Sequence, residues 1–431
     1  MIEEVMMKIP QGYKQTEIGV IPEDWNCTQT QDYIKDISMG PFGSDIKVDN
    51  FVSEGVPVLN GMNVSECKLI DKFDHFVTDA KANSLKKAVA VSGDIVITHR
   101  GTLGQVSYIP KTAKYQRYVI SQSQFRVRFS DAIYPDYIVR YLLSPIGQER
   151  LLEFRGHTGV PALAQPTTNF RNLLLIIPPV EEQRRIAEAL SDVDKLIVAL
   201  DKKIAKKKLI KQAAMQQLLT GKKRLQGFSE EWGEIEFGQY VDVFRGGSPR
   251  PIERFLTSNI DGTNWIKIGD VSPEDKYINS ATERVIKEGT KYSREVYVGD
   301  FILSNSMSFG RPYILNINGC IHDGWLVIQN YKDTFDTDFL YYLLCSDNVM
   351  KQYIAMAAGS SVKNLNKEKV ATLQLYIPID IEEQKAIAKI LSDMDEEISD
   401  LESKRNKYQL LKSGMMQKLL TGQIRLNIQY I

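Results

Sequence analysis

The stretch Glu181-Glu182-Gln183-Arg184-Arg185-Ile186-Ala187 returns 201 residues later as Glu382-Glu383-Gln384-Lys385-Ala386-Ile387-Ala388. The copies align without a gap over 181–225 and 382–426, about half of their positions are identical, and both run through Leu-Leu-Thr-Gly. Proline precedes each copy and glycine closes it, which are start and stop signals of helices. The chain is therefore predicted to be an internal duplication that can fold with a pseudo-twofold axis.

Apolar residues inside both copies recur with the four-three spacing of a coiled-coil seam. The expected seam positions are Ile186, Leu190, Val193, Ile197, Leu200 and Ile204 in the first copy, and Ile387, Leu391, Met394, Ile398 and Leu401 in the second. About 39 residues at 1.5 Å each make each helix roughly 60 Å long. Because such a helix exceeds the diameter of an ordinary domain, packing on its own domain alone is the less favoured alternative.

Charge predicts how the two helices pair. The first helix is basic in its second half, at Lys202, Lys203, Lys206, Lys207, Lys208 and Lys211. The second helix is acidic in its first half, at Asp393, Asp395, Glu396, Glu397, Asp400 and Glu402. An antiparallel pair brings these blocks together. Exposed ion pairs stabilise little, so charge selects the orientation more than it holds the helices together.

The segments before the two helices also correspond, though more weakly. Trp25 matches Trp232, Gly93-Asp94 matches Gly299-Asp300, and Gly104 matches Gly310. Short predicted strands and helices alternate in both segments. The expected organisation is a tail at 1–18, a first domain at 19–178, a central helical repeat at 179–225, a second domain at 226–378 and a C-terminal helical repeat at 379–426. The predicted fold class is α+β, with two mixed domains in tandem, each followed by a long helix of an antiparallel coiled coil.

The composition limits the class of protein. The 54 basic and 54 acidic residues cancel, so no global positive field favours nonspecific nucleic-acid binding, and any basic surface must be local. Four cysteines without a CxxC pair favour free thiols in a reducing compartment. The N-terminus is acidic and no apolar signal region follows it. We expect a cytoplasmic protein without a membrane partner.

Motifs of catalysis do not occur in the sequence. The four histidines show no metal-ligand spacing, and GxxxxGK[ST], GxGxxG and GxSxG are missing. The Asn/Asp-Pro-Pro-aromatic run that amino-methyltransferases use for a flipped base is also missing, since Ile177 and Val180 flank Pro178-Pro179. The sequence therefore favours binding over catalysis and predicts no metal site.

Glycine-rich loops after predicted strands carry polar side chains suited to nucleic acid. Arg, Gln and Asn present the forked geometries that read base edges, and glycine lets the backbone approach phosphates. The candidates are Lys47, Arg100, Thr102, Gln105 and Gln122 in the first domain, and Arg245, Arg250, Asn305, Ser306, Arg311, Lys363 and Asn364 in the second. For any one of them a solvated surface loop is an equally good interpretation. Their matching places in a duplicated domain favour a role for the set.

The repeated Glu-Glu-Gln helix ending in Leu-Leu-Thr-Gly resembles the DNA-specificity (S) subunit of type I restriction–modification enzymes. The Trp-led domains, the Gly-Asp strands and Gly-Pro-Phe-Gly-Ser at 40–44 are also similar to that family. The resemblance implies two target-recognition domains, each reading half of an asymmetric bipartite sequence in double-stranded DNA. It implies that the helices act as a ruler and dock two methyltransferase (M) subunits, which motor-nuclease (R) subunits join.

The resemblance implies a noncatalytic chain that binds no cofactor. S-adenosylmethionine would belong to the M subunits, and ATP and Mg to the R subunits. Two other interpretations stay open from the residues. A methyltransferase with fused recognition domains would need a cofactor domain, for which two domains and two long helices leave no room. A coiled-coil scaffold without DNA binding is the third possibility.

Overall fold

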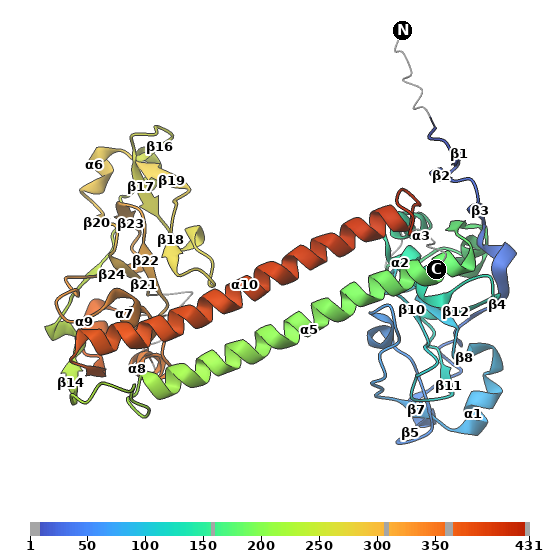
Figure 1. The fold of residues 1–431 in the computed structure, drawn as a ribbon, viewed down its shortest axis with the longest axis horizontal. Coiled ribbons are helices and arrows are strands. Elements are labelled where there is room, and N and C mark those ends of the chain that lie inside the picture. The colour runs from blue at the N-terminus through green and yellow to red at the C-terminus, as the bar shows by residue number, and fades with distance from the viewer. Residues whose placement is uncertain (1–8, 157–159, 306–309, 358–364, 427–431) are drawn as a thin grey trace, which may run out of the picture. The chain divides into compact units, whose positions relative to one another are not determined.

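The computed structural model describes residues 9–156, 160–305, 310–357 and 365–426 (Figure 1). The chain forms two compact units: unit 1 comprises Met1–Leu200 with Lys404–Ile431, and unit 2 comprises Asp201–Ser403. Each long helix is divided between the two units, so that one part of it belongs to unit 1 and the other part to unit 2. The boundaries between the two units fall inside the helical repeats expected at 179–225 and 379–426.

Unit 1 is built on a four-stranded antiparallel sheet of order β10-β9-β12-β4. Its strands are β4 (Ile34–Met39), β9 (Ile95–Thr98), β10 (Val106–Tyr108) and β12 (Gln124–Phe129). Smaller sheets pair β1 (Tyr13–Thr16) with β2 (Gly19–Pro22), β3 (Asn26–Gln29) with β13 (Leu174–Ile177), β8 (Val89–Val91) with β11 (Arg117–Val119), and β7 (Phe76–Val77) with β5 (Phe51–Val52) and β6 (Val56–Pro57). The helices are α1 (Asp79–Ser84), α2 (Pro135–Leu143), α3 (Pro145–Leu152) and α4 (Pro166–Asn172). Strand β1 lies inside the segment expected as a tail.

Unit 2 has two five-stranded sheets. One has the order β15 (Asp242–Arg245), β24 (Trp325–Gln329), β21 (Phe301–Ser304), β22 (Pro312–Leu315), β18 (Tyr277–Ile278). The other has the order β16 (Leu256–Thr257), β19 (Glu283–Val285), β17 (Thr263–Ile266), β23 (Gly319–Ile321), β20 (Arg294–Val296). Strand β14 (Trp232–Glu236) pairs with β25 (Gln374–Pro378), and the helices are α6 (Lys287–Thr290), α7 (Thr337–Leu344), α8 (Asp347–Ala357) and α9 (Lys367–Ala371). The predicted mixture of short strands and helices is confirmed in both units.

The two repeats are single uninterrupted helices, α5 (Val180–Leu218) and α10 (Ile381–Leu419), each 39 residues long. Two glutamates open each helix at the positive end of its dipole. Gly221 and Gly422 follow the ends with φ of 69° and 73°, the left-handed conformation that terminates a helix. Start and stop signals in the sequence thus predicted both helices correctly.

The first turns of each helix belong to the core of the domain before it. Ile186 and Leu190 of α5 are buried in the unit 1 core, which Leu419 and Leu420 complete. In unit 2 the equivalent positions Ile387 and Leu391 are buried with Leu218 and Leu219. These residues were expected in a helix–helix seam. They lie in a domain core that residues at the end of the other long helix also join.

Further along, the helices pair with opposite directions. In unit 2, Lys207 Nζ lies 2.6 Å from Glu397 Oε2, and Lys211 Nζ lies 2.5 Å from Asp395 Oδ1. In unit 1, Lys412 Nζ lies 2.6 Å from Asp194 Oδ1. The residue numbers of the partners on α10 decrease as the residue numbers on α5 increase. The pairing is therefore antiparallel, as the charge blocks predicted.

Candidate nucleic-acid interface

Loops of unit 1 converge where β4 and β9 end and β12 begins, which we call the loop edge of unit 1. The strand register places Met39 beside Phe125 and Thr98 beside Gln124, so the three ends lie together. Gly40 N–H donates to the Gln124 carbonyl at 2.8 Å across this edge. The following loops therefore present their side chains at one place.

The loop edge encloses an open hollow of about 760 Å³. Its polar lining includes Lys86, Lys87, Arg100 and Gln122, and all four are exposed. None of these four side chains makes a hydrogen bond or ion pair with a residue in the described part of the chain. Asp45 also lines the hollow, but two lysines and an arginine outnumber it and are available for an anionic ligand.

The backbone holds Arg100 firmly although its side chain is exposed. Its N–H donates to the Ser123 carbonyl at 3.3 Å, and it forms an isolated bridge with Ala162. Beside it, the ring nitrogen of His99 donates to the Gln122 carbonyl at 3.2 Å. Burial lowers the pKa of His99 and so disfavours its charged form. Arg100 carries a permanent positive charge at this point.

The other candidates of the first domain, Thr102, Lys47 and Gln105, are not part of the lining of this hollow. Thr102 is exposed on the turn after Arg100, and Lys47 is exposed before the 3-10 turn at Val48–Asn50. Gln105 is half-buried, with its Oε1 3.5 Å from the Thr98 hydroxyl, and it does not line the hollow.

The equivalent edge of unit 2 is built around Asp323. Here β15 ends at Arg245, β21 ends at Ser304 and β24 begins at Trp325, in the same register as in unit 1. Arg250 Nη2 lies 3.5 Å from Asp323 Oδ2, and the Asp323 carbonyl accepts from Arg245 Nε at 3.3 Å. The candidates Arg245 and Arg250 are thus brought together.

Sequence reasoning missed Asp323 and its neighbour His322, whose Nε2 lies 3.0 Å from Asp323 Oδ1. Burial by itself raises the pKa of Asp323, but the hydrogen bond from Ser248 and the adjacent cations outweigh it and keep the pKa below its usual value. A carboxylate among cations can accept a hydrogen bond from an amino group of a base. No motif marks these residues, because their partners are more than 70 positions away in sequence.

Two second-domain candidates are not exposed as expected. Asn305 is 3% exposed and donates to the Asp323 carbonyl at 3.0 Å, so it braces the edge. Arg311 lines a hollow of about 640 Å³ with Lys211 of α5 and Tyr341 and Cys345 of the domain, and it joins none of the contacts around Asp323. Ser306, Lys363 and Asn364 lie outside the described residues.

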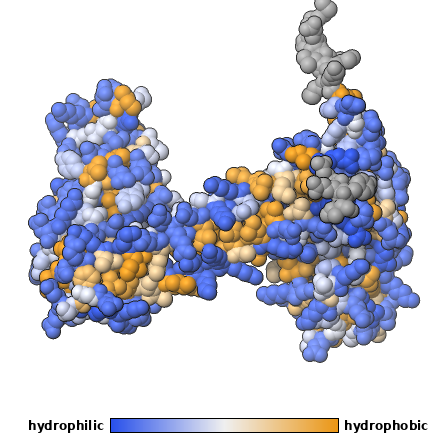
Figure 2. Space-filling view, viewed as in Figure 1, coloured by the Kyte–Doolittle hydropathy of each residue, from blue (hydrophilic) through white to orange (hydrophobic). Residues whose placement is uncertain are grey.

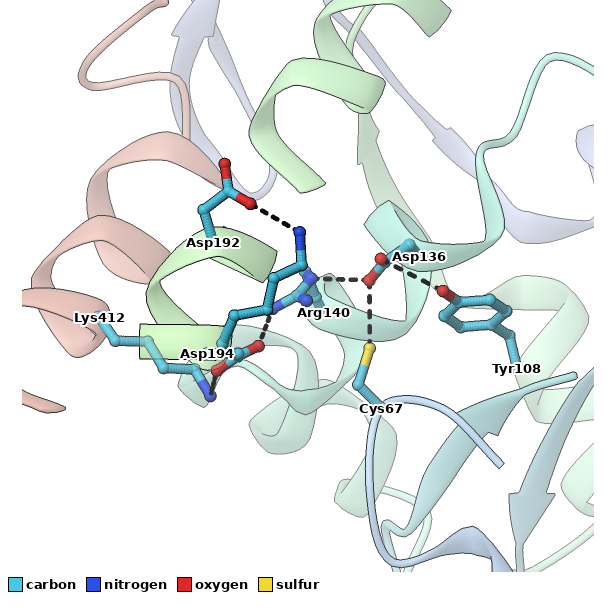
Figure 3. Close-up of polar contacts among 8 residues, drawn as sticks. Cys67, Tyr108, Asp136, Arg140, Asp192, Asp194 and Lys412 are labelled. Carbon is cyan, nitrogen blue, oxygen red and sulfur yellow. Dashed lines mark hydrogen bonds and ion pairs between the residues drawn. The ribbon is translucent and has the colours of Figure 1, made fainter. Parts of the chain in front are cut away.

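Asp194 of α5 couples the first domain to both long helices (Figure 3). It accepts from Arg140 of α2 at 2.7 Å and from Lys412 of α10 at 2.6 Å. Arg140 also reaches Asp136 at 2.7 Å, which accepts from Tyr108 at 3.3 Å.

Unit 2 repeats this arrangement with different side chains. Asp395 stands where the repeat places Asp194, and it accepts from Lys211 at 2.5 Å and from Tyr342 of α7 at 2.8 Å. Asp338, the counterpart of Asp136, accepts from Lys276 at 2.7 Å. In each unit, one aspartate of a long helix thus links a helix of the domain to the other long helix.

Within the described ranges, no cluster of His, Cys, Asp and Glu could hold a metal ion. In the same ranges no helix combines the length and apolar character needed to cross a membrane.

Comparison with known proteins finds the same family domain in both halves of the duplicated chain. The family model described as "Type I restriction modification DNA specificity domain" matches twice, at residues 52–211 and 229–410. A putative type I restriction enzyme specificity subunit of Methanocaldococcus jannaschii is 26% identical over 96% of this chain and 97% of its own length. A second specificity subunit of that organism is 24% identical over 97% of this chain and 99% of its own. The S subunit of M. genitalium has a similar fold, with a TM-score of 0.54 at 15% identity over 92% of this chain and 96% of that one. Specificity subunits have a noncatalytic role, and this chain belongs to the type I restriction–modification DNA-specificity family, with two copies of the family's domain.

Proposed function

We propose that this chain selects the DNA target of a type I restriction–modification complex, with each domain reading one half of a bipartite, asymmetric sequence. The observation that carries the proposal is that one sheet edge occurs twice with different side chains. Unit 1 presents Arg100 and Gln122 there, and unit 2 presents Arg245 and Arg250 around Asp323. Different donors and acceptors on one scaffold imply different base readout.

The proposed scaffold for two methyltransferase subunits lies on α5 and α10. Leu209 and Ile210 of α5 are 67% and 43% exposed, and Leu410 and Leu411 of α10 are 74% and 49% exposed. The two pairs stand 201 residues apart, at the same place of the repeat. Apolar residues also appear on the surface of the long helices in Figure 2. A surface that occurs twice fits two copies of one partner.

The chemistry of the proposed complex is assigned to its partners. S-adenosylmethionine belongs to the methyltransferase subunits, and ATP and Mg belong to the motor-nuclease subunits. The proposed place of action is the cytoplasm, which suits the four free cysteines Cys27, Cys67, Cys320 and Cys345.

The test is single-molecule methylome sequencing of a restriction-deficient host that expresses the methyltransferase subunit with or without this chain. We expect a modified motif of two unlike halves with an unread spacer, present only with this chain. A substitution in the methyltransferase's own cofactor site is the control for background methylation. A motif that persists without this chain, or a palindromic one, would contradict the proposal.

A further inference from the structure

Phe42 stands out on the loop edge of unit 1. Its side chain is 82% exposed, the largest value for a large apolar side chain in the described part of the chain. It also lines the hollow that contains Arg100 and Gln122. A ligand that covers an exposed aromatic ring removes its apolar surface from water, which is favourable.

The loop that carries Phe42 is braced on both sides. Phe42 N–H donates to Asp45 Oδ2 at 3.0 Å, and its carbonyl accepts from Asp45 N–H at 2.9 Å. Two residues earlier, a Cβ on Gly40 would stand 1.9 Å from the Ser121 carbonyl oxygen, so only glycine allows this close approach. The backbone therefore fixes the place from which the ring projects.

The surroundings indicate which ligand covers the ring. Lys86, Lys87 and Arg100 share the hollow with one carboxylate, Asp45, and none of the three cations forms an ion pair with a described residue. An apolar protein surface would leave these cations unpaired, whereas a nucleic acid offers phosphates to the cations and bases to the ring. In duplex DNA, an apolar side chain can enter a base step and partly unstack it.

The equivalent loop position of the second domain carries no aromatic ring. The register places Ser248 of unit 2 where unit 1 has Phe42, because Gly246 and Gly40 both donate to the first residue of a central strand. Ser248 is half-buried and donates to Asp323 Oδ1 at 2.9 Å. An aromatic contact from this loop position is therefore expected for the first half-site alone.

We propose that Phe42 enters the base stack of the half-site read by the first domain, while Lys86, Lys87 and Arg100 hold the adjacent phosphates and base edges. The inference rests on the proposed function and adds the residue that deforms the DNA. It makes Phe42 a determinant of target preference, because base steps differ in the ease with which they unstack.

The test uses the full chain purified with its methyltransferase subunit and duplexes carrying the target found by methylome sequencing. 2-Aminopurine replaces one unmethylated base at a time in either half-site, and its fluorescence rises when a base unstacks. With the wild-type complex we expect a rise at one step of the first half-site. Phe42→Ala should abolish it and weaken binding roughly 5- to 150-fold, the range of base–aromatic stacking. Phe42→Trp should keep both.

The matched control is Val48→Ala, because Val48 is 81% exposed on the same loop segment and carries no ring. It should bind like the wild type, and circular dichroism should show all variants folded. The salt dependence of binding should not change in Phe42→Ala, since no charge is removed. Probes in the second half-site serve as the internal reference and should respond equally in all variants.

The outcomes separate the two levels of the argument. If the wild-type complex ignores the target duplex, the proposed function is wrong. If the wild type binds and Phe42→Ala binds equally well, the inference is wrong. Weaker binding by Phe42→Ala with an undiminished 2-aminopurine signal at saturation would also overturn it, because the ring would then act outside the base stack. Binding of single strands in preference to the duplex would overturn it as well.

Discussion

Arg425 Nη2 lies 2.6 Å from Glu182 Oε2, so the end of the second helical repeat closes on the start of the first. The same carboxylate accepts the indole N–H of Trp25 at 3.0 Å. In unit 2, Arg224 Nη2 reaches Glu383 Oε2 at 2.7 Å. In each unit, a buried glutamate at the start of one long helix binds the tryptophan that opens the domain and the arginine that follows the other long helix. This shared contact explains why the three residue types recur together in the sequence.

Removal of the Arg425 guanidinium should destabilise unit 1. Arg425→Met leaves Glu182, which is 8% exposed, with fewer donors for its charge. Because Arg425 is itself partly exposed, we expect a loss of about 1–2 kcal/mol in the free energy of unfolding. Chemical denaturation followed by circular dichroism measures it. Arg171→Met, at an exposed arginine of α4, is the control and should change little. If Arg425→Met has the same free energy of unfolding as Arg171→Met, the contact between Arg425 and Glu182 contributes nothing to stability.

Asp194 should make the first domain acid-sensitive. Burial by itself raises the pKa of Asp194, but the hydrogen bonds from Lys412 and Arg140 outweigh it and keep the pKa below its usual value. A carboxyl whose pKa is lower in the folded state stabilises above its unfolded pKa, about 3.9, and this contribution is lost as pH falls through the folded pKa. Asp194→Asn should therefore unfold more easily than the wild type at pH 7.

The difference between Asp194→Asn and the wild type should shrink below about pH 4, where unfolded aspartates become protonated. Urea titrations at pH 7 and pH 3 measure it. Asp131→Asn removes an exposed carboxylate that, among the described residues, pairs only with Lys35, and it should match the wild type at both pH values. A difference for Asp194→Asn that stays constant with pH would contradict the argument.

Much of the fold could be predicted because the duplication supplies each signal twice. Gly93 and Gly299 both have positive φ, and the aspartate after each accepts a backbone N–H three residues earlier at 3.0 Å. This local turn recurs with its sequence, as do the helix caps at Gly221 and Gly422. Local signals of this kind determine elements without information on distant contacts.

The candidate site could be predicted only in part, because its contacts are not local. Asp323 meets Ser248 across 75 positions, and the loops differ between the two domains, so neither loop confirms the other. Arg311 shows the same limit. It follows Gly310 as Gln105 follows Gly104, yet its side chain lines a hollow beside α5. Side-chain direction depends on packing that a loop alignment does not contain.

Charged substitutions at the exposed apolar pairs of α5 and α10 should each prevent the binding of one methyltransferase subunit. Leu410→Asp with Leu411→Asp, or Leu209→Asp with Ile210→Asp, each place charge where an apolar surface is expected to be buried. Both double variants should fold, because these side chains lie outside the cores. Native mass spectrometry should show one methyltransferase subunit in place of two for each double variant, and none for the combination.

Ile260→Asp is the matched control for docking, since Ile260 is 76% exposed on a loop of unit 2 and not on a long helix. It should retain two methyltransferase subunits. If both helix variants also retain two, the exposed pairs are not the docking surface.

Arg100 and Arg250 should act on different halves of the target. Each is an exposed arginine at the loop edge of its own unit. Arg100→Ala should weaken or relax one half-site by roughly 1–3 kcal/mol, the scale of a bidentate base contact, and Arg250→Ala should do so at the other half. Lys111→Ala, after β10 at the opposite end of the unit 1 sheet, removes an equal charge and should leave both halves unchanged.

Binding of the target and of single-substituted duplexes, measured by fluorescence anisotropy at several salt concentrations, separates base contacts from phosphate contacts. A base contact loses discrimination at one position, whereas a phosphate contact weakens all sequences alike and reduces the salt slope by about one. Because Arg250 also lies 3.5 Å from Asp323, its loss removes one of the cations around that carboxylate, so Asp323→Asn should be combined with it. If the Arg250 effect comes only from this less compensated charge, the double variant should recover wild-type binding. Independent readout is refuted if Arg100→Ala alters both half-sites.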